Sequence, residues 1–259
     1  MAASPGSAPI SSTSCRPPSA EARRDRQRVT QRRIYGRRKG HRLRPGRRRL
    51  LAERLPELLL QVPEHGEIDV GALFPDRRDR LWLEIGFGGG EHLIAQAKAH
   101  PEVGMIGCEP YIAGVARLLS LAEAEGVGNL RIVVDDARLL LRTLPDACLE
   151  RIFVLFPDPW PKTRHHKRRI VNPQTAAEFA RLLRDGGELR LATDDMGYAR
   201  AMLLALLPRP ELRWQAHRPG DWRERPDDWP ATRYEQKARA AGRRCVYLRF
   251  RRAPRAERA

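Results

Sequence analysis

From Arg80 onward, short apolar runs rich in branched side chains alternate with longer stretches of helical periodicity. The apolar runs are RLWLEIG, VGMIGCE, LRIVV, RIFVLF and ELRLAT, and the stretches between and after them are EHLIAQAKAH, IAGVARLLSLAEAEG, ARLLLRTL, TAAEFARLLRDGG and GYARAMLLALL. Because a strand followed by a helix leads to a parallel neighbour, this alternation predicts a mostly parallel sheet with helices on both faces. The expected fold class is α/β.

Two later apolar runs, at residues 212–216 and 245–251, predict two more strands. A polar loop without a clear helical crossover separates them, whereas parallel neighbours need such a crossover. We therefore expect these two strands to form an antiparallel pair at one edge of the sheet.

The chain is long enough, at 259 residues, for one large α/β domain or two small ones. Residues 1–30 are rich in Ser, Pro, Ala and Arg and lack apolar periodicity, which predicts a disordered basic tail. Residues 31–259 are expected to form a single domain that ends in a basic C-terminal strand and tail. Its basic N-terminal segment, residues 31–62, includes a short amphipathic helix at 50–60 that Pro56 interrupts.

The net charge of +17 is unevenly distributed. Residues 1–50 carry 15 basic and 2 acidic side chains, residues 233–259 carry 10 and 2, and the stretch between them carries 24 and 28. Such segregated positive charge attracts polyanions, most simply nucleic acid. Codon bias is the competing explanation, because 44 of the 49 basic residues are arginine.

No run of about 18 apolar residues is present, so no membrane span is expected, and the first 15 residues lack the apolar stretch of a secretory signal. A cytoplasmic protein is expected, although the Ser- and Arg-rich start also resembles an organelle transit peptide. The four cysteines are far apart, which argues against a zinc site and a disulfide framework. Cys15 lies in the tail, and Cys108, Cys148 and Cys245 are expected to be core residues with reduced thiols.

A glycine-rich turn follows the first predicted strand in LEIGFGGGEH. Gly86, Gly88 and Gly90 allow a tight turn and a close approach of the backbone to a ligand near the start of the next helix. A dinucleotide fingerprint would need glycine at position 91, where Glu91 would repel a pyrophosphate. S-adenosylmethionine carries no phosphate and is compatible with that carboxylate.

Acidic residues follow the next two predicted strands. Glu109 comes 23 residues after Gly86, near the spacing of about 20 residues at which an acid receives ribose hydroxyls. Asp136 is a candidate acceptor for the adenine amino group, with Asp135 as the alternative. Each feature by itself is also explained by a sharp turn or a helix cap. Together, at three successive strand ends, they predict a nucleoside-binding fold.

These motifs resemble the class I S-adenosylmethionine-dependent methyltransferases. That resemblance implies a Rossmann-like, mostly parallel seven-stranded sheet with helices on both faces and an antiparallel edge strand. It also implies S-adenosyl-L-methionine as the cofactor.

The fourth predicted strand leads into FPDPWPKTRHHKRR, residues 156–169. Its prolines fix φ and hold Asp158 and Trp160 in one geometry at the carboxyl end of the sheet, where substrates meet. Trp160 is expected either to stack on a base or to pack beneath the loop. The basic side chains expected to hold phosphates are Lys162, Arg164, Lys167, Arg168 and Arg169. The competing interpretation is a stiff surface loop with a solvated charge run. His165 and His166 lack the spacing of metal ligands, and no metal site is expected.

The combination of FPDPWPK, RHHKRR, ATD at 192–194 and TRYE at 232–235 resembles the bacterial tRNA (guanine-N7-)-methyltransferases over roughly residues 35–251. The resemblance implies methyl transfer from S-adenosylmethionine to N7 of the guanine at position 46 in the variable loop of tRNA. Besides the three glycines of the turn, the implied cofactor contacts are Glu84, Glu109, Asp136 and Asp158, and Asp158 is also the implied catalytic residue. The implied substrate contacts are Lys162, Asp194, Thr232, Arg233, Tyr234 and Glu235.

Guanine N7 carries a lone pair and no proton, so its methylation requires alignment rather than a general base. Asp158 would either hold the N1 and N2 donors of guanine or stabilise the positive charge that develops on the base. The sequence is compatible with both roles.

Alternative functions make different demands on these motifs. Methyl transfer to another RNA or protein nitrogen usually places an aromatic residue directly after the prolines, and this chain has an acid and a basic run. A nicotinamide oxidoreductase is disfavoured by Glu91, and a non-catalytic RNA-binding protein would need neither the glycine turn nor Glu109.

Some features depart from the family pattern. Asp195 and Met196 follow the ATD motif where an aromatic residue is often seen, and the insert RPDDWPATRYE changes the approach to Thr232. The segment Thr232 to Glu235 is also explained as a capped helix start. The oligomeric state, monomer or homodimer, is not determined by the sequence.

Overall fold

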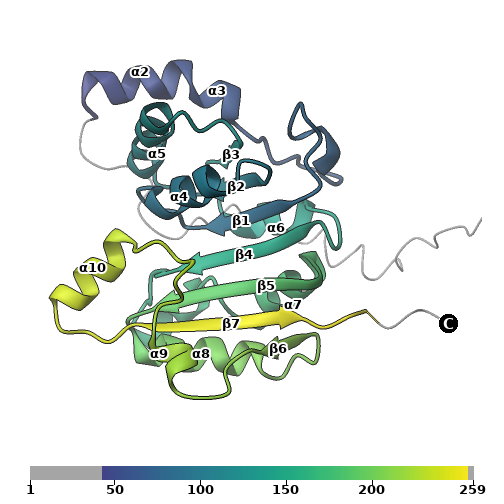
Figure 1. Cartoon of the computed structure of the whole chain (residues 1–259), viewed down its shortest axis with the longest axis vertical. Coiled ribbons are helices and arrows are strands. Elements are labelled where there is room, and N and C mark those ends of the chain that lie inside the picture. Colours follow the sequence, from purple (N-terminus) through teal and green to yellow (C-terminus); the bar gives the residue numbers. More distant parts are fainter. Residues whose placement is uncertain (1–42, 256–259) are drawn as a thin grey trace, which may run out of the picture. The chain divides into compact units, whose positions relative to one another are not determined.

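The computed structural model describes residues 43–255, and all of these belong to one compact unit. The expected disordered tail at residues 1–30, Cys15 and the first part of the basic segment 31–62 lie outside the described residues. The strands are β1 (Leu81–Ile85), β2 (Gly104–Cys108), β3 (Leu130–Val133), β4 (Leu149–Leu155), β5 (Leu183–Thr193), β6 (Leu212–Trp214) and β7 (Val246–Arg252). They form one seven-stranded sheet in the order β3-β2-β1-β4-β5-β7-β6 (Figure 1).

The strands from β1 to β5 run parallel, as the alternating sequence predicted. β7 is antiparallel to both β5 and β6, and it lies between them. The predicted antiparallel pair at one edge is therefore confirmed, with β6 as the outermost strand. The last strand of the chain, β7, therefore lies one position inside this edge.

The central strands are buried on both faces, which explains their continuous apolar runs. In β1, Leu83 and Ile85 point into one core and Trp82 into the other. β4 alternates in the same way, with Val154 in the first core and Phe153 in the second. Because side chains alternate along a strand, each strand contributes to both cores.

The α-helices are α2 (Pro45–Glu53), α3 (Leu55–Leu58), α4 (Glu91–Ala99), α5 (Ile112–Glu125), α6 (Ala137–Thr143), α7 (Pro173–Leu182), α8 (Met196–Leu206), α9 (Gly220–Arg223) and α10 (Arg233–Ala240). Two 3₁₀ helices lie at η1 (Val70–Ala72) and η2 (Thr163–Arg168). Helices α4 and α5 contribute buried residues to the Trp82 core, whereas α6, α7 and α8 contribute to the Leu83 core. The predicted helices on both faces of the sheet are confirmed.

The N-terminal helix begins earlier than the sequence predicted. It starts at Pro45, a residue that tolerates the first helical turn because its missing N–H would be unpaired there. α2 and α3 meet at Arg54, so the helix is interrupted two residues before Pro56. α2 packs on α5, which adds a second layer outside the sheet.

The cysteines within the described residues have free thiols. Cys108 and Cys245 are buried and Cys148 is half-buried, as expected for core residues. Burial raises the pKa of the Cys148 thiol to about 12. No helix between residues 43 and 255 combines the length and the apolar character that a bilayer crossing requires.

Candidate active site

The glycine turn lies at the carboxyl end of β1 and is joined to β2. The Gly86 N–H donates to the Cys108 carbonyl at 2.8 Å, and all three glycines of the turn have positive φ angles. At Gly90 a Cβ would lie 2.3 Å from Leu118 Cδ1, so only glycine fits between the turn and α5. At Gly86 a Cβ would meet nothing within 4 Å, which leaves that side of the turn open to a ligand.

Glu109 connects the glycine turn to the loop after β2. Its Oε2 accepts from the Gly88 N–H and its Oε1 accepts from the Tyr111 N–H, both at 2.9 Å. A carboxylate offers two lone pairs on each oxygen, so each oxygen retains one for a further donor. These two acceptor positions fit the two vicinal hydroxyls of a ribose, which is the group that S-adenosylmethionine would present here.

The pKa of Glu109 is raised above the ordinary value. Burial is the main cause, and the nearby carboxylates of Asp158 and Glu84 raise the pKa further. The two backbone N–H donors act in the opposite direction. Three of the predicted cofactor acids therefore lie close enough to influence one another.

Glu84 lies below the turn rather than on its surface. Glu84 is the next-to-last residue of β1, and its side chain is buried. Its Oε2 lies 2.7 Å from His92 Nδ1 in α4. Nε2 of His92 lies 3.4 Å from Gln96 Nε2. The Gln96 amide in turn donates to the carbonyl of Asp228 at 3.0 Å. This buried polar chain was not predicted from the sequence, in which the histidine at the second position of the helix after the glycine turn was its signal.

Asp136 begins α6 as its N-cap. Its Oδ1 accepts from the Arg138 N–H at 2.9 Å, and its Oδ2 pairs with the Arg138 guanidinium at 3.0 Å. The Asp135 carboxylate accepts from the Asp136 N–H at 2.8 Å. The helix cap that the sequence allowed is thus present, and Asp135 and Asp136 are both half-buried at the end of β3. Glu91, which disfavoured a dinucleotide, pairs with Arg117 at 2.8 Å.

The loop after β4 is held in an unusual backbone conformation. Phe156 and Trp160 have φ angles of 51° and 45°, in the left-handed region that residues other than glycine rarely adopt. Such conformations persist only where the surroundings enforce them. The Phe156 N–H donates to the Ala192 carbonyl at 2.7 Å, and the Arg169 Nε–H donates to the Pro159 carbonyl at 2.8 Å. Asp158 is exposed on this rigid loop.

The basic run is not uniform, which corrects one expectation. Arg169 is 8% exposed and its guanidinium lies 4.8 Å from the centre of the Tyr198 ring, so it clamps the loop and is not free to hold a phosphate. The side chains that remain exposed are Lys162, Arg164 and Lys167. Trp160 packs within its own loop, edge-on to His165 at 5.9 Å and under the Arg168 guanidinium at 4.8 Å.

The segment from Thr232 to Glu235 is a capped helix start, as the simpler interpretation held. Thr232 Oγ1 accepts from the Glu235 N–H at 3.0 Å. The Glu235 side chain is buried and accepts from the Tyr247 hydroxyl at 2.7 Å, and it pairs with Arg225 and Arg239. Figure 1 shows α10 at the edge to which the arrowheads of β1, β4 and β5 point.

The two middle residues of this segment are more accessible than Thr232 and Glu235, and Tyr234 is the exposed one. Tyr234 is 40% exposed, and its ring lies so close to Gly88 that a Cβ on that glycine would be 2.8 Å from Tyr234 Cε2. The Arg233 guanidinium lies 5.3 Å from the centre of the Tyr234 ring. The structure therefore brings an expected substrate residue onto the expected cofactor turn.

Asp194 and the insert occupy the neighbouring strand ends. Asp194 follows β5, and its Oδ2 pairs with Arg243 Nε at 2.6 Å. The insert before Thr232 is anchored by Trp229, which is buried against the Tyr247 ring, and by Asp228, which pairs with Arg190 at 2.7 Å. Between residues 43 and 255 no group of three or more His, Cys, Asp or Glu side chains is arranged to hold a metal ion.

Comparison with known proteins agrees with this geometry. The family model described as a putative methyltransferase matches residues 78–248. A tRNA (guanine-N(7)-)-methyltransferase of Rhodospirillum rubrum is 57% identical over 227 residues, which cover 86% of this chain and 89% of the relative. A protein of the same name from Nitrobacter hamburgensis is 48% identical over 219 residues, covering 85% of this chain and 86% of the relative.

A solved structure supports the fold independently. The 16S rRNA methyltransferase KamB superposes with a TM-score of 0.53 at 15% identity, over 73% of this chain and 96% of that one. With the family match and the two relatives, this likeness gives the conclusion that the chain belongs to the tRNA (guanine-N7-)-methyltransferase family and has the class I methyltransferase fold.

Proposed function

We propose that this protein transfers the methyl group of S-adenosylmethionine to N7 of the guanine at position 46 in the variable loop of tRNA. The observation that carries the proposal is the meeting of Gly88, Glu109 and Asp158 at adjacent strand ends, beside an exposed basic loop. The names of the relatives support a tRNA guanine as the acceptor. A tRNA substrate implies that the protein acts in the cytoplasm.

The proposed cofactor-binding residues at the ends of β1, β2 and β3 would bind and orient S-adenosylmethionine. S-adenosylmethionine supplies an electrophilic methyl group when it is bound. Glu109 would accept the ribose hydroxyls with its two remaining lone pairs, and the open side of Gly86 would admit the ligand close to the backbone. Asp136 would receive the adenine amino group at the end of β3. Glu84 would act through its position below the turn.

The residues proposed to contact the tRNA would align guanine N7 with the methyl group. Because N7 has no proton to remove, the rate enhancement comes from positioning, which contributes on the order of 7–11 kcal/mol in well-oriented reactions. Asp158 is the proposed catalytic residue, since its exposed carboxylate lies near Glu109. It would hold the guanine N1 and N2 donors or stabilise the developing positive charge.

The remaining proposed substrate contacts divide by exposure. Lys162 and Tyr234 are exposed and Arg233 is half-buried beside Tyr234, and all three would touch the RNA. Thr232 and Glu235 are buried and would position those residues through the cap and the side-chain network of α10. Asp194 is partly exposed beside Arg243 and would contact the nucleotide from the end of β5.

The test is methylation of unmodified tRNA with labelled S-adenosylmethionine, followed by chemical cleavage of the RNA at N7-methylguanine. We expect one cleavage site, at the variable-loop guanine. Label at adenine or in a protein would contradict the proposal and favour the alternative acceptors. A tRNA transcript with adenine at position 46 is the matched control and is expected to remain unlabelled.

A further inference from the structure

A pocket of about 420 Å³ lies beside the start of β7. Its volume is within the range of about 300–1,000 Å³ that small-ligand sites occupy. Val246 lines it and pairs with Thr193, the last residue of β5, so the pocket lies at the same edge of the sheet as the candidate active site.

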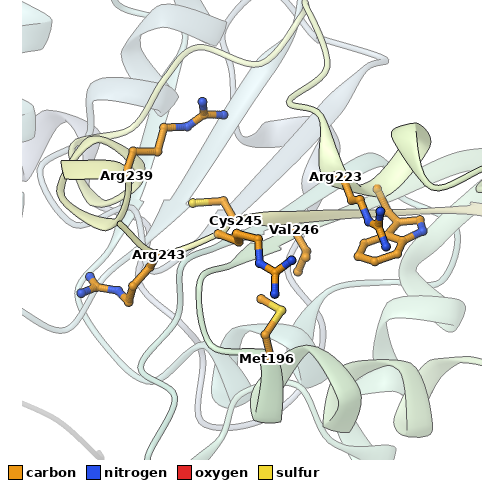
Figure 2. A pocket seen from close by; sticks show the side chains of 8 residues that line it. Met196, Arg223, Arg239, Arg243, Cys245 and Val246 are labelled. Atoms are coloured by element: carbon orange, nitrogen blue, oxygen red, sulfur yellow. The ribbon is translucent and has the colours of Figure 1, made fainter. Parts of the chain in front are cut away.

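The wall of the pocket is rich in arginine. Figure 2 shows Arg223 on one side and Arg239 and Arg243 on the other, and Arg244 also lines the pocket. Arg239 pairs with Glu235 and Arg243 pairs with Asp194, so two of the four positive charges are balanced. Within residues 43–255, Arg223 and Arg244 have no carboxylate partner, which leaves an uncompensated positive charge at the rim.

The floor of the pocket is apolar and partly aromatic. Met196, Cys245 and Val246 lie between the arginines in Figure 2, and Met196 is 44% exposed. Trp222 completes the lining, with the Arg223 guanidinium 4.6 Å from its ring centre. A nucleotide combines a flat apolar base with an anionic phosphate, and aromatic and arginine side chains together recognise that combination.

We propose that this pocket binds an unpaired nucleotide of the tRNA next to the guanine that is methylated. The inference rests on the proposed function for the identity of the RNA. The base would lie on Met196 and the Trp222 indole, and Arg223 and Arg244 would hold its phosphate. The Arg243–Asp194 pair joins the pocket to a proposed contact of the target guanine, because Arg243 lines the pocket and Asp194 follows β5.

The experiment measures tRNA binding directly and scores methylation separately. The dissociation constant of unmodified tRNA is determined for the wild type, Arg223→Ala/Arg244→Ala, Met196→Glu and Trp222→Phe, at several salt concentrations. Met196→Glu adds a negative charge at an exposed first helical residue that tolerates an acid, so the fold is preserved. Met196→Gln is its uncharged match.

Arg213→Ala is the matched arginine control. Arg213 is exposed in β6 and lies in register with Arg251 and Glu188, at the opposite end of the sheet from Thr193. We expect the double arginine variant to weaken tRNA binding about tenfold and to lower the salt slope by about one to two, since each phosphate-binding side chain accounts for about one. We expect Met196→Glu to weaken binding about tenfold as well, and Met196→Gln and Arg213→Ala to change it less than about twofold.

A tRNA series with one abasic site at each nucleotide flanking the target guanine identifies the base. At one position the missing base should weaken binding by the wild type about fivefold to tenfold and should weaken binding by Met196→Glu much less. The inference is overturned if the pocket variants bind like Arg213→Ala, or if no abasic position discriminates between wild type and Met196→Glu. If the wild type binds tRNA through the pocket but methylates no guanine, the proposed function fails while the pocket assignment stands.

Discussion

The ring of Tyr234 at the start of α10 lies against Gly88 in the turn after β1. The positive φ of that glycine turns its side-chain position toward the phenol, with no room for a methyl group between them. The contact joins the segment expected to bind RNA to the turn expected to bind the cofactor. Binding of either substrate would therefore affect the position of the other binding element.

Gly88→Ala tests this contact. Alanine at a φ of 56° costs about 1–2 kcal/mol of stability, and its methyl group would lie 2.8 Å from Tyr234 Cε2. We expect the affinity for tRNA to fall at least fivefold, because Tyr234 must move. Gly126→Ala is the control, since Gly126 has a φ of 65° and no atom within 4 Å of the added Cβ. It should lose similar stability in urea unfolding and keep its tRNA affinity; equal tRNA affinities of the two variants would contradict the coupling.

Asp158→Asn should remove turnover while retaining the cofactor. Removal of one electrostatic interaction at the reacting centre typically lowers kcat by a factor on the order of 10²–10³, and we expect the dissociation constant of S-adenosylmethionine to change less than about threefold. Single-turnover methylation and calorimetry measure the two quantities. Asp79→Asn, at an exposed position before β1, is the control and should leave both unchanged. Near-normal turnover in Asp158→Asn would show that the reaction centre lies elsewhere.

The raised pKa of Glu109 predicts a pH dependence of cofactor affinity. A protonated carboxyl loses acceptor capacity, so affinity for S-adenosylmethionine should fall as the pH is lowered through a pKa above the ordinary 4.5. Asp158→Asn removes a like charge and should shift this midpoint to lower pH. Glu109→Gln should bind weakly with no such midpoint. A midpoint that Asp158→Asn leaves unchanged would contradict the electrostatic coupling.

The Glu109 carboxyl group also makes the free energy of unfolding depend on pH. The folded state holds the Glu109 proton more tightly than the unfolded state, so its contribution makes the free energy of unfolding decrease as the pH rises from 4.5 through the raised pKa. Urea unfolding of wild type and Glu109→Gln between pH 4 and 7 measures the difference, which Glu109→Gln should abolish.

Two arginines of one basic run are expected to behave differently. Arg169 is a buried clamp, so Arg169→Ala should lower the free energy of unfolding by about 2 kcal/mol, as expected when a hydrogen bond from a charged donor is removed. It should also reduce kcat by loosening the loop around Asp158. Arg164 is exposed, so Arg164→Ala should raise the KM for tRNA and lower its salt slope by about one without loss of stability. Identical effects of the two substitutions would refute this division.

Glu235 is expected to stabilise α10 through the contacts of its buried carboxylate. Glu235→Ala leaves the Tyr247 hydroxyl and two arginines without their acceptor, although solvent screens Arg239. We expect the free energy of unfolding to fall by about 2–3 kcal/mol. Glu235→Gln retains an acceptor for Tyr247 and should lose about half as much. Chemical denaturation measures both, and an unchanged stability of Glu235→Ala would indicate that the residue acts on the substrate alone.

Local patterns were sufficient to predict the fold and to place the glycine turn and Glu109 at one edge of the sheet. The alternation of apolar and helical stretches depends on periodicities that each segment carries by itself, so the parallel strands, both helical layers and the antiparallel edge were predictable. The glycine turn and Glu109 were predictable for a related reason. The carboxyl ends of parallel strands share one edge, so acids placed there in the sequence meet in space.

The sequence could not show which residues of the loop after β4 and of α10 hold these segments in place and which are accessible to a substrate. Arg164 and Arg169 belong to one charge run, and only packing against Tyr198 and the Pro159 carbonyl shows that one of them is a clamp. Thr232 and Glu235 belong to one motif with Tyr234, and burial separates the residues that position the segment from the one that faces the site.

The sequence by itself determined which residue types stand at each strand end, and hence the chemistry available there. Only the tertiary structure decided that Tyr234 rests on Gly88, that His92 supports Glu84, and that an arginine-rich pocket lies beside Asp194. The Tyr234–Gly88 contact and the pocket join segments that are distant in the chain. Their geometry depends on how β7 and α10 pack on the finished sheet, and no local periodicity encodes that packing.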